Sequence, residues 1–329
     1  MKAIVIQEDR SLVWQDVPDP TPAAGEVCIE VHAAALNRAD LLQREGTYPP
    51  PPGCPDWPGL EVAGVICALS PEAEAEGRFH LGDKVCALLG GGGYAEYVTV
   101  PSCMCMPMPK GLSMVEAAAL PEAFATAWLN LSYVGEAKAG ETLLMQAGAS
   151  GLASVVIPMA RAMGLRVITT VLGQEKVEQV AYLHADRVVD TTTESLAEVL
   201  KEEAAAGHPV NLAIDCLGGP TLGECLRHVA FGCRWIMIAT LAGDDSVIDF
   251  RNVYVKNIRL IGSTLRSKSP AVKGEILAEL VEKVWPMLES GQIPQKIHAV
   301  LPITEAEAAQ DILYRGENVG KVVLTVKED

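Results

Sequence analysis

The sequence is poor in basic residues, and this shortage limits the partners that the protein can have. Lys and Arg total 26 against 42 Asp and Glu, so the formal net charge is -16. A surface of that sign repels nucleic-acid phosphates and anionic membranes. No uninterrupted apolar run approaches the ~18 residues of a membrane span, and the first residues, MKAIVIQEDR, lack the long uncharged core of a secretion signal. We therefore expect a cytoplasmic protein with no nucleic-acid or membrane partner.

The cysteines lack the spacing of a disulfide framework or of a zinc site. There are nine, an odd count, and they are spread through strand-like and helix-like segments. Cys103 and Cys105 form a C-x-C pair, but no second pair follows, and none of the six histidines is spaced as a zinc partner. No serine lies in a G-x-S-x-G elbow, so hydrolase chemistry has no support. We expect reduced thiols and no bound metal.

A chain of 329 residues is too long for one ordinary core, so we expect two domains. The first hundred residues alternate short β-type runs with turns, which predicts a mainly β domain. We interpret the proline-rich stretch YPPPPGCPDWPG as a stiff loop rather than a ligand for a peptide-recognition domain. The four glycines Gly90 to Gly93 lie between two strand-like runs and predict a hairpin turn.

The hydrophobic pattern changes at about Ser113. Residues 113–134 are predicted to form one helix, and from Glu141 strand-like and helix-like segments alternate regularly. The predicted strands are TLLMQAG, RVITTV, RVVD, VNLAIDCLG, RWIMIATL and IRLIGST. Five strand-helix steps followed by a final strand predict an α/β fold with a doubly wound parallel sheet. The last sixty residues do not extend this pattern, so we expect them to return to the first domain.

The loop MQAGASGLAS, residues 145–154, opens the first strand-helix unit but lacks two of the three glycines of a dinucleotide-binding loop. In the pattern G-x-G-x-x-G/A, Gly148 takes the first position, Ser150 the second and Ala153 the third. Gly151 restores the close backbone approach that Ser150 hinders. The start of the next helix then offers N–H groups and a positive dipole end to a diphosphate. A corner that needs glycine only for its geometry is the alternative.

The second predicted strand ends without the acidic residue that binds the ribose of NAD, roughly 20 positions past the first glycine. Lys176 follows shortly and could face the 2′-phosphate of NADPH, although Glu175 stands beside it. A solvated helix lysine is the alternative. The sequence therefore predicts NADPH as the cofactor.

Seven segments of the sequence resemble, in order, one known family. They are NRADLLQREGTYPPPPG, GLEVAGVI, GGGYAEYVTVP, AAALPEAFATAW, QAGASGLAS, DCLGG and STLRS, and the closing ENVGKVVLTV extends the likeness to the end of the chain. The chain resembles the quinone oxidoreductase group of the zinc-independent medium-chain dehydrogenase/reductase superfamily. Within that group it is most similar to the branch typified by the tumour-suppressor-inducible quinone reductase, a relative of zeta-crystallin.

The resemblance implies an architecture and a chemistry. It implies a GroES-like β domain, residues 1–118 and 266–329, which carries the substrate site, and a Rossmann-type dinucleotide-binding domain, residues 119–265. It further implies an enzyme that uses NADPH, needs no metal and forms a homodimer or a larger homo-oligomer. Zinc-dependent members of the superfamily carry Gly-His-Glu where this sequence has Gly59, Leu60 and Glu61, and leucine cannot bind zinc.

The resemblance also implies site residues. Tyr48 and Asn37 stand where the family lines its substrate cleft. Gly173 stands where relatives often have a serine and Asp190 where they often have a tyrosine, which weakens the expected preference for NADPH. Pro158 falls inside the first Rossmann helix and should kink it. The implied cofactor contacts are Thr126, Gly148, Ser150, Gly151, Leu152, Ala153, Gly173, Lys176, Leu241, Ala242, Leu265, Arg266 and Asn318.

Four side chains carry the predicted chemistry. Tyr48 is our candidate donor to the oxyanion that forms on the acceptor, and a tyrosine packed over its loop is the alternative. Asn37 and Asp40 either orient substrate or ribose or cap the following helix. Arg266 suits an anionic cofactor in so acidic a chain, with a surface ion pair as the alternative.

Together these features predict an NADPH:quinone oxidoreductase whose partner is a small-molecule quinone or a related electron acceptor. The other hypotheses are an NADPH-dependent reductase of conjugated enones and a crystallin-like cofactor-binding protein with vestigial activity.

Overall fold

The computed structural model describes residues 1–327, and the chain divides into two compact units. Unit 1 comprises Met1–Ala125, Arg266–Gly291 and the segment from Gln295 onward. Unit 2 comprises Thr126–Leu265 and Gln292–Pro294. The first boundary lies at 125/126, within helix α4 (Pro121–Trp128), seven residues beyond the 118/119 boundary expected from the sequence.

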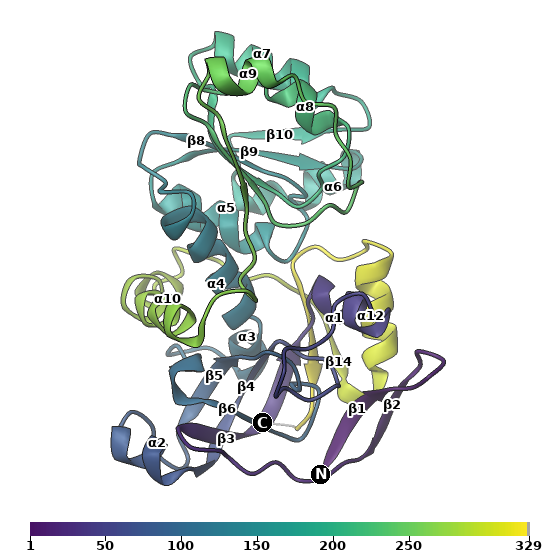
Figure 1. Ribbon diagram of the computed structural model, residues 1–329, viewed down its shortest axis with the longest axis vertical. Coiled ribbons are helices and arrows are strands. Elements are labelled where there is room, and N and C mark those ends of the chain that lie inside the picture. The colour runs from purple at the N-terminus through teal and green to yellow at the C-terminus, as the bar shows by residue number, and fades with distance from the viewer. Residues whose placement is uncertain (328–329) are drawn as a thin grey trace. The chain divides into compact units, whose positions relative to one another are not determined.

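Unit 1 contains a seven-stranded sheet in which most neighbours are antiparallel (Figure 1). The main path runs β14-β15-β3-β4-β5-β7, and β6 pairs with β3 beside that path, while β1 and β2 form a separate two-stranded sheet. Because β15 pairs with β3, the C-terminal segment lies in the same sheet as the N-terminal strands. The strands are β1 (Lys2–Ile6), β2 (Leu12–Asp16), β3 (Glu26–Ala35), β4 (Glu61–Leu69), β5 (Lys84–Leu88), β6 (Tyr97–Pro101), β7 (Cys105–Pro107), β14 (Ile297–Pro302) and β15 (Lys321–Thr325).

Helices of unit 1 begin at residues that favour a helix start. Ser113 accepts a hydrogen bond from the Glu116 N–H ahead of α3, and Ser269 with Pro270 opens α10. The single helix expected over 113–134 is wrong: α3 ends at Ala118, and Pro121, which lacks an N–H, begins α4 instead. The helices are α1 (Arg38–Arg44), α2 (Pro71–Glu76), α3 (Met114–Ala118), α10 (Pro270–Lys283), α11 (Trp285–Glu289) and α12 (Ala306–Tyr314).

The glycine run between β5 and β6 is not the hairpin turn that the sequence predicts. β5 pairs with β4 and β7, whereas β6 pairs with β3. The run instead packs against the proline-rich loop: Gly93 donates its N–H to the Gly59 carbonyl at 3.0 Å. A Cβ added at Gly59 would lie 2.6 Å from the Cα of Gly93, so the two segments can approach this closely only because both positions are glycine.

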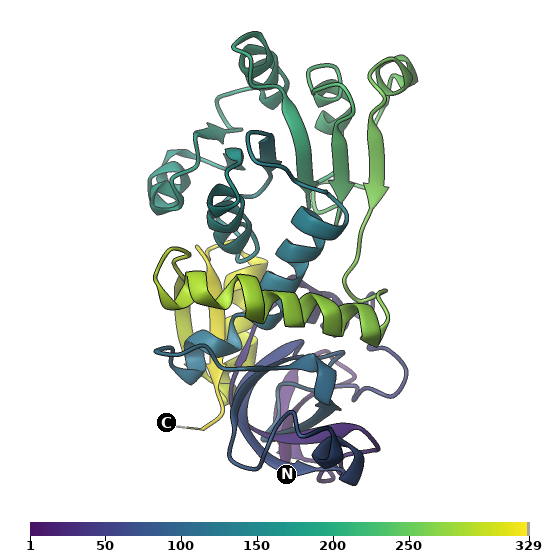
Figure 2. The same cartoon turned by 90° about the vertical axis from the view of Figure 1, so that its left-hand side faces the viewer.

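Unit 2 is a doubly wound α/β unit, as the strand-helix alternation predicts. Its six strands are parallel and follow the order β10-β9-β8-β11-β12-β13. Figure 2 shows neighbouring strands of this sheet pointing in the same direction. The strands are β8 (Thr142–Met145), β9 (Arg166–Val171), β10 (Arg187–Asp190), β11 (Val210–Asp215), β12 (Arg234–Met237) and β13 (Arg259–Gly262).

Helices cover both faces of the six-stranded sheet (Figure 1). Apolar side chains of α7 and α8 pack against β8 to β12 around Trp235, which is fully buried. α5 packs on β8 and β9 and continues through Pro158. The strand order reverses between β8 and β11, which is the switch point where sheets of this class bind ligands. The helices are α5 (Ala153–Ala162), α6 (Gln174–Gln179), α7 (Leu196–Ala205), α8 (Thr221–Cys225) and α9 (Phe250–Val255), preceded by the π-helical turn Leu129–Tyr133.

Candidate functional site

The loop between β8 and α5 in unit 2 needs glycine at its first position. The N–H of Gly148 donates to the Thr170 carbonyl at 2.7 Å, which draws the loop against β9. A Cβ at Gly148 would lie 2.5 Å from the Thr169 hydroxyl oxygen, closer than real Cβ contacts come. Ala153, at the third position, is completely buried, so a methyl group fits there. The loop therefore has the close packing that the dinucleotide-binding pattern requires.

Three N–H groups of this loop have no acceptor among residues 1–327, those of Ala149, Gly151 and Leu152, and the last two lie next to α5. Ser150 donates its own N–H to the Ala147 carbonyl, and its hydroxyl accepts the Ala153 N–H at 3.1 Å. The N–H groups of Gly151 and Leu152 have no acceptor within residues 1–327. Both precede the ten-residue helix α5, whose N-terminal end favours an anion. The loop fits a diphosphate through these two amides, because the N–H groups of Ser150 and Ala153 are already bonded within the loop.

The loop after β9 contains the other cofactor residues expected near the adenosine. Gly173 has φ +90°, a conformation that suits glycine, and stands just before α6. Its N–H donates to an Asp190 carboxylate oxygen at 2.8 Å, so the two positions singled out as departures are bonded to each other. Lys176 lies in α6 and is partly exposed.

The residues expected on the nicotinamide side lie after β12. Leu241 donates its N–H to the Cys216 carbonyl at 3.1 Å, and Ala242 donates to the Leu217 carbonyl at 2.7 Å. These bonds join the loop after β12 to the loop after β11, at the carboxyl ends of two neighbouring strands. Leu241 is about half exposed, so its side chain is available to a ligand. Thr126 in α4 and the buried Leu265 also belong to unit 2.

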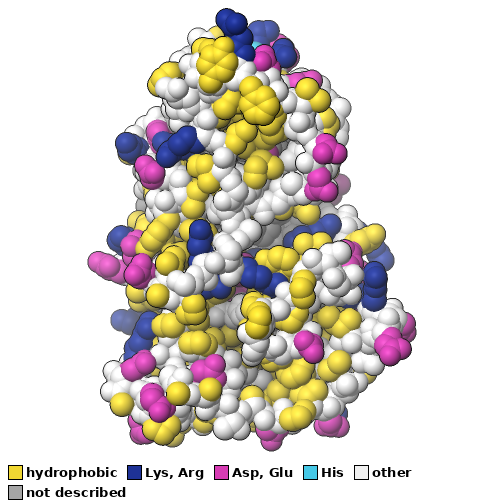
Figure 3. All heavy atoms as spheres, viewed as in Figure 1, with side chains coloured by type: hydrophobic (Ala, Val, Ile, Leu, Met, Phe, Trp, Pro, Cys, Tyr) yellow, Lys and Arg dark blue, Asp and Glu magenta, His cyan; other side chains and the backbone are white. Residues whose placement is uncertain are grey.

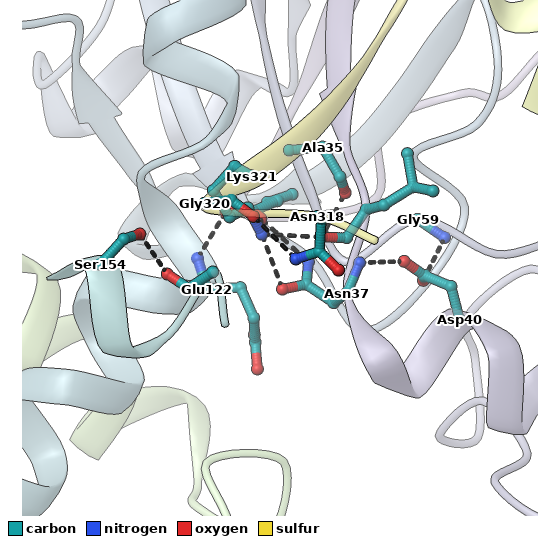
Figure 4. Close-up of polar contacts among 12 residues, drawn as sticks. Ala35, Asn37, Asp40, Gly59, Glu122, Ser154, Asn318, Gly320 and Lys321 are labelled. Atoms are coloured by element: carbon teal, nitrogen blue, oxygen red, sulfur yellow. Dashed lines mark hydrogen bonds and ion pairs between the residues drawn. The ribbon is translucent and has the colours of Figure 1, made fainter. Parts of the chain in front are cut away.

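Unit 1 holds a buried ionic network that sequence reasoning missed. The ammonium of Lys321 donates to the Leu36 carbonyl at 2.8 Å, the Asn37 amide oxygen at 2.9 Å and a Glu61 carboxylate oxygen at 2.6 Å. The Asn37 amide nitrogen donates to the same Glu61 oxygen at 2.9 Å. Figure 4 shows the ammonium of Lys321 pointing toward Asn37. Because both ends of its amide are bound, Asn37 serves this network, and its predicted catalytic role stays a prediction.

Asp40 takes the capping role that the sequence left as one of two alternatives. Its carboxylate accepts the N–H of Asn37 at 2.7 Å at the start of α1 and the N–H of Gly59 at 3.1 Å (Figure 4). It also accepts the hydroxyl of Tyr94 at 3.0 Å. The side chain is fully buried. Burial raises the pKa of Asp40 to about 6, although these hydrogen bonds oppose the rise. Both carboxylate oxygens of Asp40 therefore already accept hydrogen bonds from groups of unit 1.

Glu122, in the first turn of α4, is a partly buried acid that the sequence did not single out. Its N–H donates to the other Glu61 oxygen at 2.8 Å, which ties the start of α4 to the network. Burial raises the pKa of the Glu122 carboxyl to about 7, the charge of Glu61 adds to the rise, and Lys321 and Lys273 oppose it. The sequence signal for the network is weak: Glu61 and Lys321 are single charges that each begin a largely apolar strand, β4 and β15.

Tyr48 and Arg266 are brought together in unit 1. The Arg266 guanidinium lies 3.7 Å from the centre of the Tyr48 ring, and its Nη1 donates to the Pro49 carbonyl at 2.9 Å. Burial raises the pKa of the Tyr48 phenol, and the charge of Arg266 partly opposes this shift. The phenol therefore keeps its proton at neutral pH. A surface ion pair for Arg266, the alternative, is not what the structure shows.

The last expected contact, Asn318, donates its side-chain amide to the Gly320 carbonyl at 2.9 Å, next to the start of β15 (Figure 4). Residues 1–327 contain no group of three or more His, Cys, Asp or Glu side chains placed to hold a metal. Over the same residues, no helix is long and apolar enough to cross a membrane.

Two family models match the chain, one in each part. Residues 23–110 match the alcohol dehydrogenase GroES-like domain, and residues 151–282 match the zinc-binding dehydrogenase family. A quinone oxidoreductase-like protein 2 homolog from Nematostella vectensis is 29% identical over 307 residues, which cover 92% of this chain and 82% of the relative. The quinone oxidoreductase of Rattus norvegicus is 28% identical over 311 residues, which cover 94% and 92% of the two chains.

A solved structure extends the likeness to nearly every residue. The quinone oxidoreductase of Thermus thermophilus, solved also in complex with NADPH, is 32% identical and superposes with a TM-score of 0.82. The match covers 99% of this chain and 100% of that one. The chain therefore belongs to the medium-chain dehydrogenase/reductase superfamily, as an NAD(P)-dependent oxidoreductase whose relatives include these quinone oxidoreductase-like proteins.

Proposed function

We propose that the protein is a metal-free NAD(P)H-dependent quinone oxidoreductase. The observation that carries the proposal is the loop between β8 and α5, where Gly148 permits close packing and the N–H groups of Gly151 and Leu152 are open. Its likeness to quinone oxidoreductases over almost the whole chain supports a quinone as the acceptor. Within this group we propose the tumour-suppressor-inducible branch, on the sequence segments quoted above.

In this proposal, residues of unit 2 bind the dinucleotide and residues of unit 1 bind the acceptor. In unit 2, the amides of Gly151 and Leu152 hold the diphosphate through hydrogen bonds to charged oxygens. The bound nicotinamide supplies the hydride. In unit 1, the protonated phenol of Tyr48 donates a hydrogen bond to the acceptor oxygen as negative charge develops on it. Arg266 holds the Tyr48 ring by stacking on it and by its bond to the Pro49 carbonyl, so the phenol is oriented in advance.

Some residues of this chain favour NADPH as the hydride donor, and others favour NADH. Support for NADPH comes from Lys176 and from the NADPH complex of the Thermus thermophilus relative. The acidic side chain of Asp190, bonded to Gly173, opposes a second phosphate at the same loop.

We further propose that two copies of the chain associate through unit 2. β13 is the last strand in the order of its sheet, and an edge strand offers unpaired backbone groups to another chain. Exposed apolar side chains gather on and before α9, and Figure 3 shows hydrophobic atoms over the region where Figure 1 places this helix. They are Val247, Phe250, Tyr254 and Val255. Sedimentation of the protein should give twice the monomer mass, and a monomer at micromolar concentration would exclude this arrangement.

A kinetic comparison tests the proposed function. We expect the protein to oxidise NADPH or NADH with a benzoquinone, at a turnover number on the order of 1 to 10³ per second. The Tyr48→Phe variant should lose about tenfold in kcat/KM for the quinone, because one hydrogen bond to developing charge is removed, with no change in dinucleotide affinity. Tyr97→Phe, in β6, is the matched control and should behave as the wild type.

Three results would contradict the proposal. Faster turnover of a simple enone than of the quinone would indicate the enone reductase. Dinucleotide binding without turnover of either acceptor would indicate the crystallin-like protein. A Tyr48→Phe variant with full activity would remove Tyr48 from the chemistry.

A further inference from the structure

Asp190, the last residue of β10, carries a carboxylate whose two oxygens differ in their surroundings. Its Oδ1 accepts three hydrogen bonds, from the Gly173 N–H at 2.8 Å, the Thr192 N–H at 3.0 Å and the Thr192 hydroxyl at 2.7 Å. Its Oδ2 accepts no hydrogen bond in the part of the chain that the structure describes. This oxygen is not among the buried atoms that lack a partner, so it is accessible to a ligand. The residue is only 7% exposed, so the carboxylate is fixed with one oxygen satisfied and the other open.

The position of this carboxylate in the sheet is informative. β10 runs parallel to β9, and Asp190 is the partner of Val171, the last residue of β9. Sheets of this class recognise the adenosine ribose with an acidic residue near the end of their second strand, which is β9 here. The sequence has no acid at the end of that strand itself. The neighbouring strand brings one to the same edge of the sheet and bonds it to the Gly173 loop.

The chemistry of the open oxygen selects between two ligands. Hydrogen bonds from the Thr192 hydroxyl, the Thr192 N–H and the Gly173 N–H lower the pKa of Asp190, so the group is ionised at neutral pH. An ionised carboxylate only accepts hydrogen bonds, so Oδ2 can bind a ribose hydroxyl. A 2′-phosphate at the same place offers further negative charge and no suitable donor, and the two anions repel.

We propose that Asp190 binds the adenosine ribose hydroxyls through Oδ2 and so makes NADH the more tightly bound donor of this protein. The inference rests on the proposed use of a nicotinamide dinucleotide. It holds that the effect of Asp190, which favours NADH, exceeds that of Lys176, which favours NADPH. Asp190 then replaces, from β10, the acid that β9 lacks.

The Asp190→Asn variant separates this role from a purely structural one. The asparagine oxygen can keep the three hydrogen bonds made by Oδ1, while the amide nitrogen in place of Oδ2 can no longer accept one. Full-length wild type and variant are titrated calorimetrically with NADH and with NADPH, in the absence of any acceptor. We expect the wild type to bind NADH more tightly, and the variant to lose about tenfold or more of that preference.

A matched control removes the same charge nearby. Glu175→Gln, in the first turn of α6, should change the ratio of the two dissociation constants by less than about twofold, because exposed charges are screened. Circular dichroism reports folding, and Asp190→Ser replaces Asp190→Asn if the latter does not fold.

The inference is overturned if the wild type prefers NADPH, if the ratio is unchanged without the Asp190 carboxylate, or if Glu175→Gln shifts it equally. Intact NADH binding with no quinone turnover would instead count against the proposed function alone.

Discussion

One cluster of polar groups in unit 1 and one loop in unit 2 differ in whether their hydrogen bonds are made within the protein. In unit 1, the ammonium of Lys321 and the carboxylate of Glu61 are buried and bonded to each other and to Asn37. In unit 2, the N–H groups of Gly151 and Leu152 have no internal acceptor among residues 1–327. Buried polar groups are nearly always hydrogen-bonded, so the paired charges of unit 1 belong to the folded framework, while the partly exposed N–H groups of Gly151 and Leu152 can bind a ligand. The contrast separates residues that hold the fold from residues that we propose bind the cofactor.

The largest effect should follow from breaking the framework of unit 1. Lys321→Met leaves the Glu61 carboxylate buried without its cation, which should lower the free energy of unfolding by about 3 to 5 kcal/mol. Urea denaturation measures this loss. The double variant Lys321→Met with Glu61→Gln should recover part of it, since no buried charge is then left alone. A loss below about 1 kcal/mol for the single variant would show that the pair does not support the fold.

A smaller, pH-dependent effect is expected at Glu122. Its pKa of about 7 in the folded protein lies above the ordinary 4.5, so the folded state binds the proton more tightly than the unfolded chain. Stability from this group is present at low pH and is lost as pH rises from about 4.5 to 7. Glu122→Gln removes the titration, so the variant should exceed the wild type by about 2 to 3 kcal/mol at pH 8 and nearly equal it at pH 5. Denaturation curves at both values test this, and parallel pH profiles would contradict it.

The smallest effect should arise in the loop of unit 2. Ser150→Ala removes the hydroxyl that accepts the Ala153 N–H, which should cost about 1 kcal/mol of stability. Because that N–H is then released to a ligand, dinucleotide affinity should stay the same or increase. Ser154→Ala, which loses a bond to the Gly151 carbonyl, is the control serine. A tenfold loss of affinity in Ser150→Ala alone would mean that the hydroxyl itself binds the cofactor and that open amides are not the main contact.

Much of unit 2 could be predicted because its signals are local. Short apolar runs alternate with helical segments, and this is enough to indicate six parallel strands and to place Gly148 after the first of them. Local signals failed where partners are distant in the chain. The glycine run looked like a hairpin because the sequence does not reveal that β6 pairs with β3 and that Gly93 packs on Gly59.

In the candidate site, too, the features with a local sequence signal could be predicted, and those that depend on distant partners could not. The loop at Gly148 and Ser150 could be recognised from its pattern, and the resemblance named Tyr48 and Arg266, but not their stacking. Neither the Glu61–Lys321 pair nor its link to Glu122 could be predicted, since these residues are far apart in sequence and each alone looks like an ordinary surface charge.

The amino-acid sequence by itself determined the class of fold and the place of the glycine loop, because periodicity and turn residues act over a few neighbouring positions, whereas the superfamily was indicated by the resemblance of whole segments to a known family. Only the tertiary structure decided which charges are buried together and that Asp190, at the end of β10, lies beside the end of β9. The physical reason is that strand order and register bring residues together irrespective of their separation in the chain, and burial then decides which of their polar groups must pair.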